Sequence, residues 1–148
     1  MNMKVLLDAG PLGMVSNPNA STYNRECYEW MESLIVNGGQ ILVPEIADYE
    51  VRRELLRANK TPGIARLDLL KDTIGYLPIT TTVMLKAAEL WAQARKSGMP
   101  TADPKALDCD VILAAQALEA SAIVATENIG HLSRFVKSMH WRDIKDTE

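Results

Sequence analysis

The sequence predicts an α/β fold in which a mainly parallel sheet is covered by helices on both faces. Short apolar runs typical of buried strands alternate with longer segments of helical periodicity. This alternation is characteristic of parallel sheets with helical crossovers. The 148 residues show no internal repeat, low-complexity tract or linker. We therefore expect a single domain, 1–148, that is long enough to bury its own core.

The first half of the chain is expected to form two strands and three helices. Gly10 and Pro11 are typical turn residues and follow the first apolar run. Ser21 can cap the first helix, which the Asn-Gly-Gly segment at 37–39 ends, and Pro44 suits the start of the next. In chain order we expect a strand at 3–7, a helix at 21–36, a strand at 41–43, and helices at 44–59 and 62–74.

The second half repeats the alternation. Thr81 or Thr82 can cap a strong helix that Gly98 ends. A later helix is apolar on nearly all sides and is expected to be the central buried helix. The expected elements are a strand at 76–79, a helix at 80–97, a loop at 99–105, a helix at 107–120, a strand at 122–125, a short helix at 129–136 and a final strand at 139–144.

Composition restricts the classes of protein that the chain can belong to. A net charge of −3 argues against a protein that coats nucleic acid non-specifically, although an enzyme acting on nucleic acid remains compatible with it. No apolar stretch approaches the roughly 20 residues that a membrane span needs, and the N-terminus does not resemble a signal peptide. Cys27 and Cys109 lack metal-ligand spacing. We expect both to be free thiols in a reducing cytoplasm.

Four carboxylates stand at expected junctions between elements: Asp8, Glu50, Asp108 and Asp110. A charge beside a core element is costly unless it is paired or binds a metal. In open parallel sheets, ligands bind beyond the carboxyl ends of the strands. Asp8 ends the first expected strand, Glu50 lies about two turns into the helix after the second, and Asp110 lies in the first turn of the central helix. These positions predict one site that gathers several acids around a cation.

The chemistry of such a site follows from its oxygen ligands. Mg²⁺ and Mn²⁺ prefer carboxylate and water oxygens. A bound cation can lower the pKa of a water molecule for attack on a phosphodiester and can stabilise the charge that develops on the phosphate. Each acid also has a structural explanation. Asp8 can cap the following turn, Asp108 and Asp110 can be helix N-terminal acids, and Glu50 can be a solvated helix acid.

Four segments resemble the motif regions of the PIN domain family, and most resemble its VapC-type toxin ribonucleases from bacterial toxin–antitoxin pairs. They are MKVLLDAGPLG, VPEIADYEVRREL, LDCDVILAAQAL and IVATENIGHLSRF, in that order along nearly the whole chain. The resemblance implies a three-layer α/β/α fold with an acidic site for Mg²⁺ or Mn²⁺. It also implies cleavage of single-stranded RNA, usually by a homodimer, and an antitoxin protein that restrains the enzyme.

The resemblance assigns roles to three carboxylates position by position. Asp8 matches the aspartate that ends the first strand, and Glu50 matches the glutamate of the second helix, although Glu45 lies nearby. Asp110 matches the aspartate that precedes the apolar helix, and Asp108 is a candidate additional ligand. The implied catalytic set is therefore Asp8, Glu50 and Asp110.

The fourth corner of the site departs from the family pattern. Family members often carry an aspartate in or just after a Thr-x-Asn/Asp segment, whereas this chain has Thr126, Glu127 and Asn128, followed by His131. Asn128 is the expected metal ligand here, with Thr126 and Glu127 in support. Glu127 can replace the missing carboxylate if its side chain points into the cleft.

A basic region follows Glu50 and includes Arg52, Arg53 and Arg57. These arginines can hold RNA phosphates near the acids. They can also form a solvated helix face paired with neighbouring glutamates, or a docking site for a partner's tail. The sequence therefore leaves their role open.

Two other functions compete with a metal-dependent ribonuclease. The altered fourth corner allows a catalytically weak PIN-like module that binds nucleic acid or protein. A phosphatase of the aspartyl-phosphate kind is disfavoured, because that chemistry requires a second aspartate two residues after Asp8, and this position is Gly10.

Overall fold

A five-stranded, all-parallel sheet forms the middle of the protein. The computed structural model describes residues 3–19, 21–98, 104–130 and 132–145, with the backbone alone for 104–106. The strands lie in the order β3-β2-β1-β4-β5, and each neighbouring pair is parallel. Their bounds are β1 (Lys4–Leu7), β2 (Gln40–Pro44), β3 (Tyr76–Leu77), β4 (Ile123–Thr126) and β5 (Ser138–His140).

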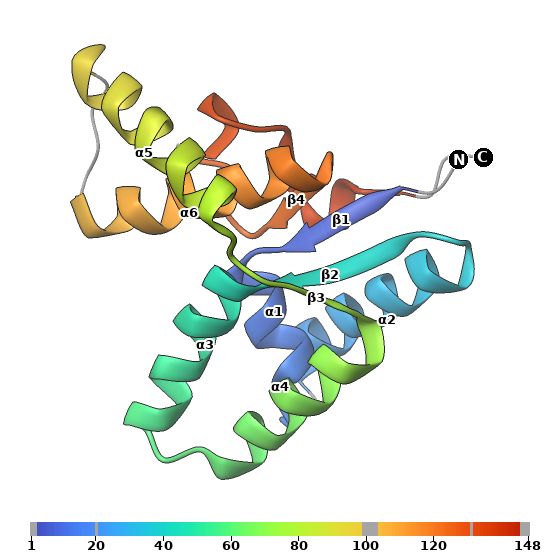
Figure 1. Ribbon diagram of the computed structural model, residues 1–148. Coiled ribbons are helices and arrows are strands. Elements are labelled where there is room, and N and C mark those ends of the chain that lie inside the picture. The colour runs from blue at the N-terminus through green and yellow to red at the C-terminus, as the bar shows by residue number, and fades with distance from the viewer. Residues whose placement is uncertain (1–2, 20, 99–103, 131, 146–148) are drawn as a thin grey trace.

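Helices cover both faces of this sheet (Figure 1). On one face, α5 (Thr81–Lys96) and α6 (Pro104–Ala120) pack in the same core cluster as Leu6 and Val124. On the other face, α1 (Ala9–Ser16), α2 (Thr22–Val36) and α4 (Thr61–Ile74) enclose a second cluster with Val5 and Leu7. Successive residues of β1 point to opposite faces, as the period of a strand requires. The predicted three-layer α/β/α fold is therefore confirmed.

The remaining helix, α3 (Glu45–Arg57), begins directly at the end of β2. Its first turn contributes Ile46 to one core cluster and Ala47 to the other. The buried Gln116 side chain of α6 fixes this position, since its amide donates to the carbonyl of Leu77 at 2.8 Å and its Oε1 accepts from Ile46 N at 3.4 Å. The start of α3 is thus anchored at the carboxyl edge of the sheet.

The register brings the ends of β1 and β4 together. Leu7 pairs with Ala125, and the backbone N–H of Asp8 donates to the carbonyl of Ala125 at 2.9 Å. The residues that follow these two strands therefore emerge side by side at one edge of the sheet. This is the edge at which parallel sheets bind ligands.

Two expectations for the helices were wrong in a way that affects the site. Gly10 and Pro11 do not form a turn but lie in the first turn of α1, where proline is tolerated because its missing N–H would have no helical partner. The central helix begins at Pro104, about one turn before the expected 107. Residues 99–103 of the expected loop lie outside the described residues, and 104–105 are helical.

The C-terminal part also differs from expectation. The helix expected at 129–136 is reduced to a short 3₁₀ turn, η1 (Leu132–Arg134). The strand expected at 139–144 is β5, which ends at His140, followed by a second 3₁₀ turn, η2 (Trp141–Asp143). Trp141 is 2% exposed, so η2 packs into the core beneath α2.

The helix caps were largely predictable. Ser21 caps α2 by accepting from Asn24 N, whereas Thr80, not Thr81 or Thr82, caps α5 by accepting from Val83 N. Gly98 follows α5 at φ +65°, a conformation that glycine adopts without strain. Within the described residues, no helix is long and apolar enough to cross a membrane. Cys27 and Cys109 are both free thiols.

Candidate active site

Four segments that are distant in the sequence line one cavity of about 350 Å³ at the carboxyl edge of the sheet. Asp8 follows β1, Glu50 lies in α3, Asp110 lies in α6, and the segment 126–128 ends β4 and continues beyond it. The structure therefore brings three of the predicted carboxylates together with Thr126, Glu127 and Asn128. We call this space the acidic cavity.

Asp8 is fixed by hydrogen bonds at both carboxylate oxygens. Its Oδ1 accepts from the backbone N–H of Ala9 at 2.7 Å, which makes Asp8 the N-cap of α1. Its Oδ2 accepts from the Thr126 hydroxyl at 2.8 Å. The capping explanation for Asp8 and its place in the acidic cavity are therefore compatible, because one oxygen serves the helix and the other faces β4.

The pKa of Glu50 is shifted by its surroundings in the acidic cavity. Burial raises the pKa of its carboxyl from 4.5 to about 7, and the negative charges of Asp8 and Asp110 add to the increase. Arg53 and a hydrogen bond from Cys109 act in the opposite direction on this pKa. Repulsion among three carboxylates is the condition that a bound cation relieves.

Asp110 and Asp108 have different surroundings although they share a helix. Asp110 is the seventh residue of α6 and lines the acidic cavity, so the helix N-terminus does not explain its position. Asp108 lines a separate cavity of about 410 Å³ with Met84 and Trp91, between α5 and α6. Two residues along a helix correspond to a rotation of about 200°, which directs the two carboxylates to different faces.

The segment after β4 is held to Asp8 through Thr126. The Thr126 hydroxyl accepts from the backbone N–H of Asn128 at 3.1 Å while it donates to Asp8. Asn128 is exposed at the acidic cavity. Its amide lies close to Gly130, where an added Cβ would approach Asn128 Oδ1 to 3.2 Å. His131 lies outside the described residues.

Glu127 has partners that the sequence did not indicate. Its carboxylate accepts from the Tyr23 hydroxyl at 2.9 and 3.1 Å and from the Trp141 indole N–H at 2.5 Å. His140 Nε2 lies 3.4 Å from the same carboxylate. These partners come from α2, β5 and η2, so no motif or spacing around Glu127 could have identified them.

Cys109 is a second unpredicted neighbour of the site. Its thiol forms a hydrogen bond with Glu50, and burial followed by the charge of Glu50 raises the thiol pKa to about 11. The group is therefore a protonated thiol at neutral pH. It donates a hydrogen bond to Glu50 and is a poor nucleophile.

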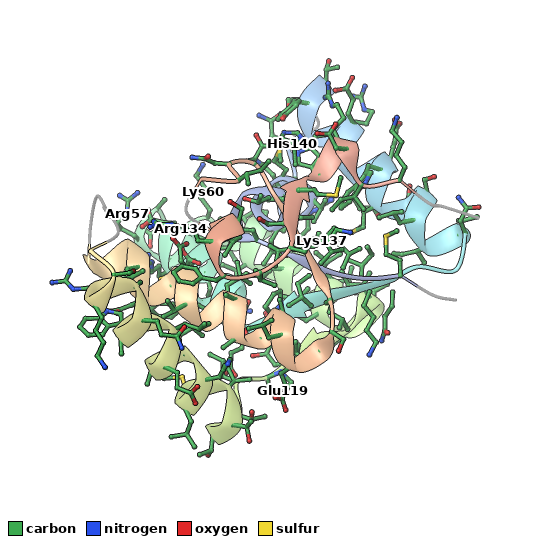
Figure 2. All side chains as sticks on the ribbon, turned by 90° about the horizontal axis from the view of Figure 1, so that it is seen from above. Arg57, Lys60, Glu119, Arg134, Lys137 and His140 are labelled. Carbon is green, nitrogen blue, oxygen red and sulfur yellow. The ribbon has the colours of Figure 1, made fainter. Side chains whose placement is uncertain are left out.

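The three arginines after Glu50 differ in their engagement. Arg52 forms ion pairs with Asp48 at 2.9 Å and Asp68 at 2.6 Å, and so ties α3 to α4. Arg57 pairs with Glu54 at 2.8 Å on the exposed face of α3 and stands out from the surface in Figure 2. Arg53 stacks over the Tyr49 ring at 5.0 Å and lowers the pKa of Glu50. Arg53 is thus coupled to the acidic cavity.

The donor set fits a hard divalent cation in kind. Within the described parts of the chain, no three histidine, cysteine, aspartate or glutamate side chains stand close enough to hold a metal ion as they are. The acidic cavity nevertheless offers oxygen donors from Asp8, Glu50, Asp110 and Asn128, and its carboxylates repel one another. Mg²⁺ often needs only one or two carboxylates and retains several waters.

A larger cavity of about 770 Å³ adjoins the acidic cavity. The two share Ala9, Gly10 and Glu50 as lining residues. The larger cavity runs between α1 and the α3–α4 hairpin, and Asn59 and Lys60 lie along it. We call these two adjoining cavities the groove.

Comparisons with known proteins agree with this architecture. Solved structures that share the fold include VapBC2 from Rickettsia felis bound to a DNA fragment from the VapBC2 promoter, FitAcB from Neisseria gonorrhoeae, and VapBC-1 from nontypeable Haemophilus influenzae. Their TM-scores are 0.76, 0.69 and 0.73, at 17%, 21% and 17% identity. The matches cover 94%, 95% and 95% of this chain, and 99%, 99% and 100% of the matched chains.

A search of curated proteins found no significant match. The family model described as the PIN domain matches residues 12–136. These residues include Glu50, Asp110 and the segment 126–128, whereas Asp8 precedes them and lines the same cavity. Since the matched residues make up most of the chain, the protein belongs to the PIN domain family.

Proposed function

We propose that the protein is a metal-dependent endoribonuclease that cleaves phosphodiester bonds of single-stranded RNA. The observation that carries the proposal is the convergence of Asp8, Glu50 and Asp110 on one cavity of a PIN domain. Burial, with a smaller contribution from the charges of Asp8 and Asp110, raises the pKa of Glu50 to about 7. A perturbed carboxyl in a cleft is typical of a functional site.

Mg²⁺ or Mn²⁺ is the proposed cofactor, held by Asp8, Glu50, Asp110 and Asn128. When bound, such a cation would lower the pKa of a water molecule and stabilise the charge that develops on the phosphate. The protein's own contribution is orientation. Thr126 fixes Asp8 through the 2.8 Å hydrogen bond, and the Cys109 thiol donates to Glu50. Asp108 is left out of this ligand set because it lines a different cavity.

Basic residues beside the groove are the proposed contacts for RNA phosphates. Arg53 is the best placed of the three predicted arginines, because its charge already acts on Glu50. Arg57 is exposed and can exchange its pair with Glu54 for a phosphate. Arg52 is engaged by two aspartates and is better explained as a structural residue. Single-stranded RNA is the proposed substrate because an open groove admits a flexible strand.

The same activity suggests a biological role as the toxin of a toxin–antitoxin pair in the cytoplasm. The similarity in fold to chains of VapBC and FitAB complexes supports this role. We propose that an antitoxin restrains the enzyme by inserting a segment into the groove that begins at the carboxylates. We also propose that the protein works as a homodimer.

The central test is a cleavage assay on a single-stranded RNA oligonucleotide with Mg²⁺ or Mn²⁺, with and without EDTA. Asp8→Asn and Asp110→Asn are expected to reduce cleavage at least about 100-fold while the protein stays folded, as judged by circular dichroism. Asp108→Asn is the matched control, since it makes the same change two residues away at another cavity. Undiminished metal-dependent cleavage by both site variants would contradict the proposal.

One observation favours a second candidate, a PIN-like module that binds nucleic acid or protein but cleaves poorly. Asn128 occupies the corner where related proteins often have a carboxylate, and an amide binds a cation more weakly. Calorimetric titration with Mn²⁺ separates the two candidates. Binding in the millimolar range or tighter supports the nuclease, whereas no binding at millimolar Mn²⁺ favours the module.

A further inference from the structure

Glu127 lies between two residues that face the acidic cavity, yet its own carboxylate is turned to other partners. It accepts hydrogen bonds from the Tyr23 hydroxyl and from the Trp141 indole. His140, labelled at the end of β5 in Figure 2, lies 3.4 Å away. Three elements therefore converge on one carboxylate at the wall of the cavity.

The aliphatic part of Glu127 packs against α1, while the side chain as a whole is 36% exposed. A Cβ placed on Gly10 would come within 2.9 Å of Glu127 Cγ, so the side chain lies directly on α1. Trp141 is 2% exposed. The centroid of its ring lies 5.5 Å from that of Tyr23 and 5.3 Å from that of His140. The donors to Glu127 are thus held by aromatic packing, and the carboxylate cannot turn toward the acids without giving up these hydrogen bonds.

Glu127 is linked to Asp8 and Asn128 through its neighbours in the chain. Glu127 is covalently flanked by Thr126 and Asn128. The Thr126 hydroxyl accepts a hydrogen bond from the Asn128 backbone N–H and donates one to Asp8 Oδ2 at 2.8 Å. Fixing Glu127 therefore fixes the direction in which Asn128 leaves the strand and the hydroxyl that orients Asp8. Groups that orient metal ligands in this way tune metal affinity without contacting the metal.

We propose that Glu127 is a positioning residue, which with Tyr23 and Trp141 anchors the Thr126–Asn128 segment at the acidic cavity, and is not itself a metal ligand. The proposal rests on the proposed metal-dependent nuclease function and adds to it a residue that acts through Asp8 and Asn128. The proposal explains why Glu127 stands beside the fourth ligand position of the site without serving as the ligand there.

The decisive variant is Tyr23→Phe, which removes a donor from Glu127 and leaves the carboxylate in place. If Glu127 positions the segment, Tyr23→Phe weakens Mn²⁺ binding measured by calorimetry, in the same direction as Glu127→Gln. Loss of such a contact typically costs about 10- to 100-fold in metal affinity or activity, and the single hydroxyl should fall at the low end. If Glu127 is a ligand, freeing it leaves the affinity unchanged or improves it, which would overturn the proposal.

Nuclear magnetic resonance gives a readout that needs no cleavage. The Trp141 indole N–H signal is expected far downfield in the wild type because it donates to a carboxylate, and to move upfield in Glu127→Gln. Saturating Mg²⁺ should leave the wild-type signal in its hydrogen-bonded position. A large upfield shift on adding Mg²⁺ would mean that Glu127 has swung to the cation, and the proposal would fail.

Glu26→Gln is the matched control. It breaks the 2.7 Å pair between α2 and Arg142 of η2 without touching Glu127, so it reproduces any general loosening of this interface. Its Mn²⁺ affinity and RNA cleavage should stay within about twofold of the wild type. Wild-type protein that neither binds Mn²⁺ nor cleaves RNA would contradict the proposed function itself. Wild-type activity with unchanged affinity in Tyr23→Phe would contradict the positioning role alone.

Discussion

The Glu50 carboxyl links the stability of the protein to its proposed chemistry. Burial and the charges of Asp8 and Asp110 raise its pKa to about 7. Near neutral pH the side chain is therefore divided between a neutral form that suits the cation-free cavity and an anionic form that suits metal binding. A site that functions with a cation is expected to be strained without one, because its ligands are like charges held together.

This strain predicts a pH-dependent effect of Glu50→Gln in metal-free buffer. In the unfolded chain the carboxyl ionises near 4.5, whereas in the folded protein it ionises near 7. Between these values the unfolded state binds fewer protons, so raising the pH lowers the free energy of unfolding of the wild type, and the loss is complete above pH 7. The amide that replaces the carboxyl in Glu50→Gln cannot ionise, so the variant should become the more stable protein by about 1–2 kcal/mol above pH 7.

Urea unfolding of both proteins in EDTA, from pH 4.5 to 8.5, measures this difference. The advantage of Glu50→Gln over the wild type should be small at pH 4.5, grow through pH 6 and level off above pH 7. A difference that stays constant across this range would show that the carboxyl does not titrate as the structure requires.

At the scale of elements, α6 explains why two aspartates that the sequence places near the start of one helix line different cavities. The apolar run after Asp110 identifies the helix and its burial. The predicted start of the helix is too late, because Pro104 follows a proline-containing segment typical of a loop, although proline is also favoured at the first helical position. With the correct start, Asp110 cannot be an N-terminal acid, and the helical rotation separates it from Asp108.

The α3–α4 hairpin is the element that positions Glu50, and two partly buried ion pairs that share Asp48 hold it together. The Asp48 side chain is 10% exposed and contacts Arg52 at 2.9 Å and Lys71 of α4 at 3.5 Å. Asp48→Ala leaves two cations partly desolvated without their common partner. We expect a loss of about 2 kcal/mol, which for a chain of this size lowers the Tm by about 6 °C.

Thermal unfolding followed by circular dichroism checks this prediction. Glu54→Ala is the matched control on the same helix, since it removes an exposed pair with Arg57 and should cost less than about 0.5 kcal/mol. Equal effects of the two variants would show that the Asp48 network does not hold α3 to α4.

At the scale of the whole molecule, the fold was predictable because each layer has a local signature. Short apolar strands alternate with helices, and parallel connection then places Asp8, Asp110 and the residues after β4 at one edge. The partners of Glu127 were not predictable, because Tyr23 lies 104 residues away and Trp141 falls within a predicted strand. Helix α1 was missed for a local reason, since a Gly-Pro pair is more typical of turns than of a helical first turn.

The assembled molecule should be stabilised by the cation that its acidic cavity is proposed to bind. A ligand that binds only the folded state raises the free energy of unfolding by about 2.7 kcal/mol at 100 times its Kd. For a chain of 148 residues, this corresponds to an increase in Tm of about 8 °C. Mn²⁺ should give this increase in the wild type and in Asp108→Asn, whose carboxylate faces another cavity. Asp110→Asn should show little or none of it. An equal increase in all three proteins would mean that Mn²⁺ binds elsewhere on this acidic protein and that the convergence of carboxylates is not its site.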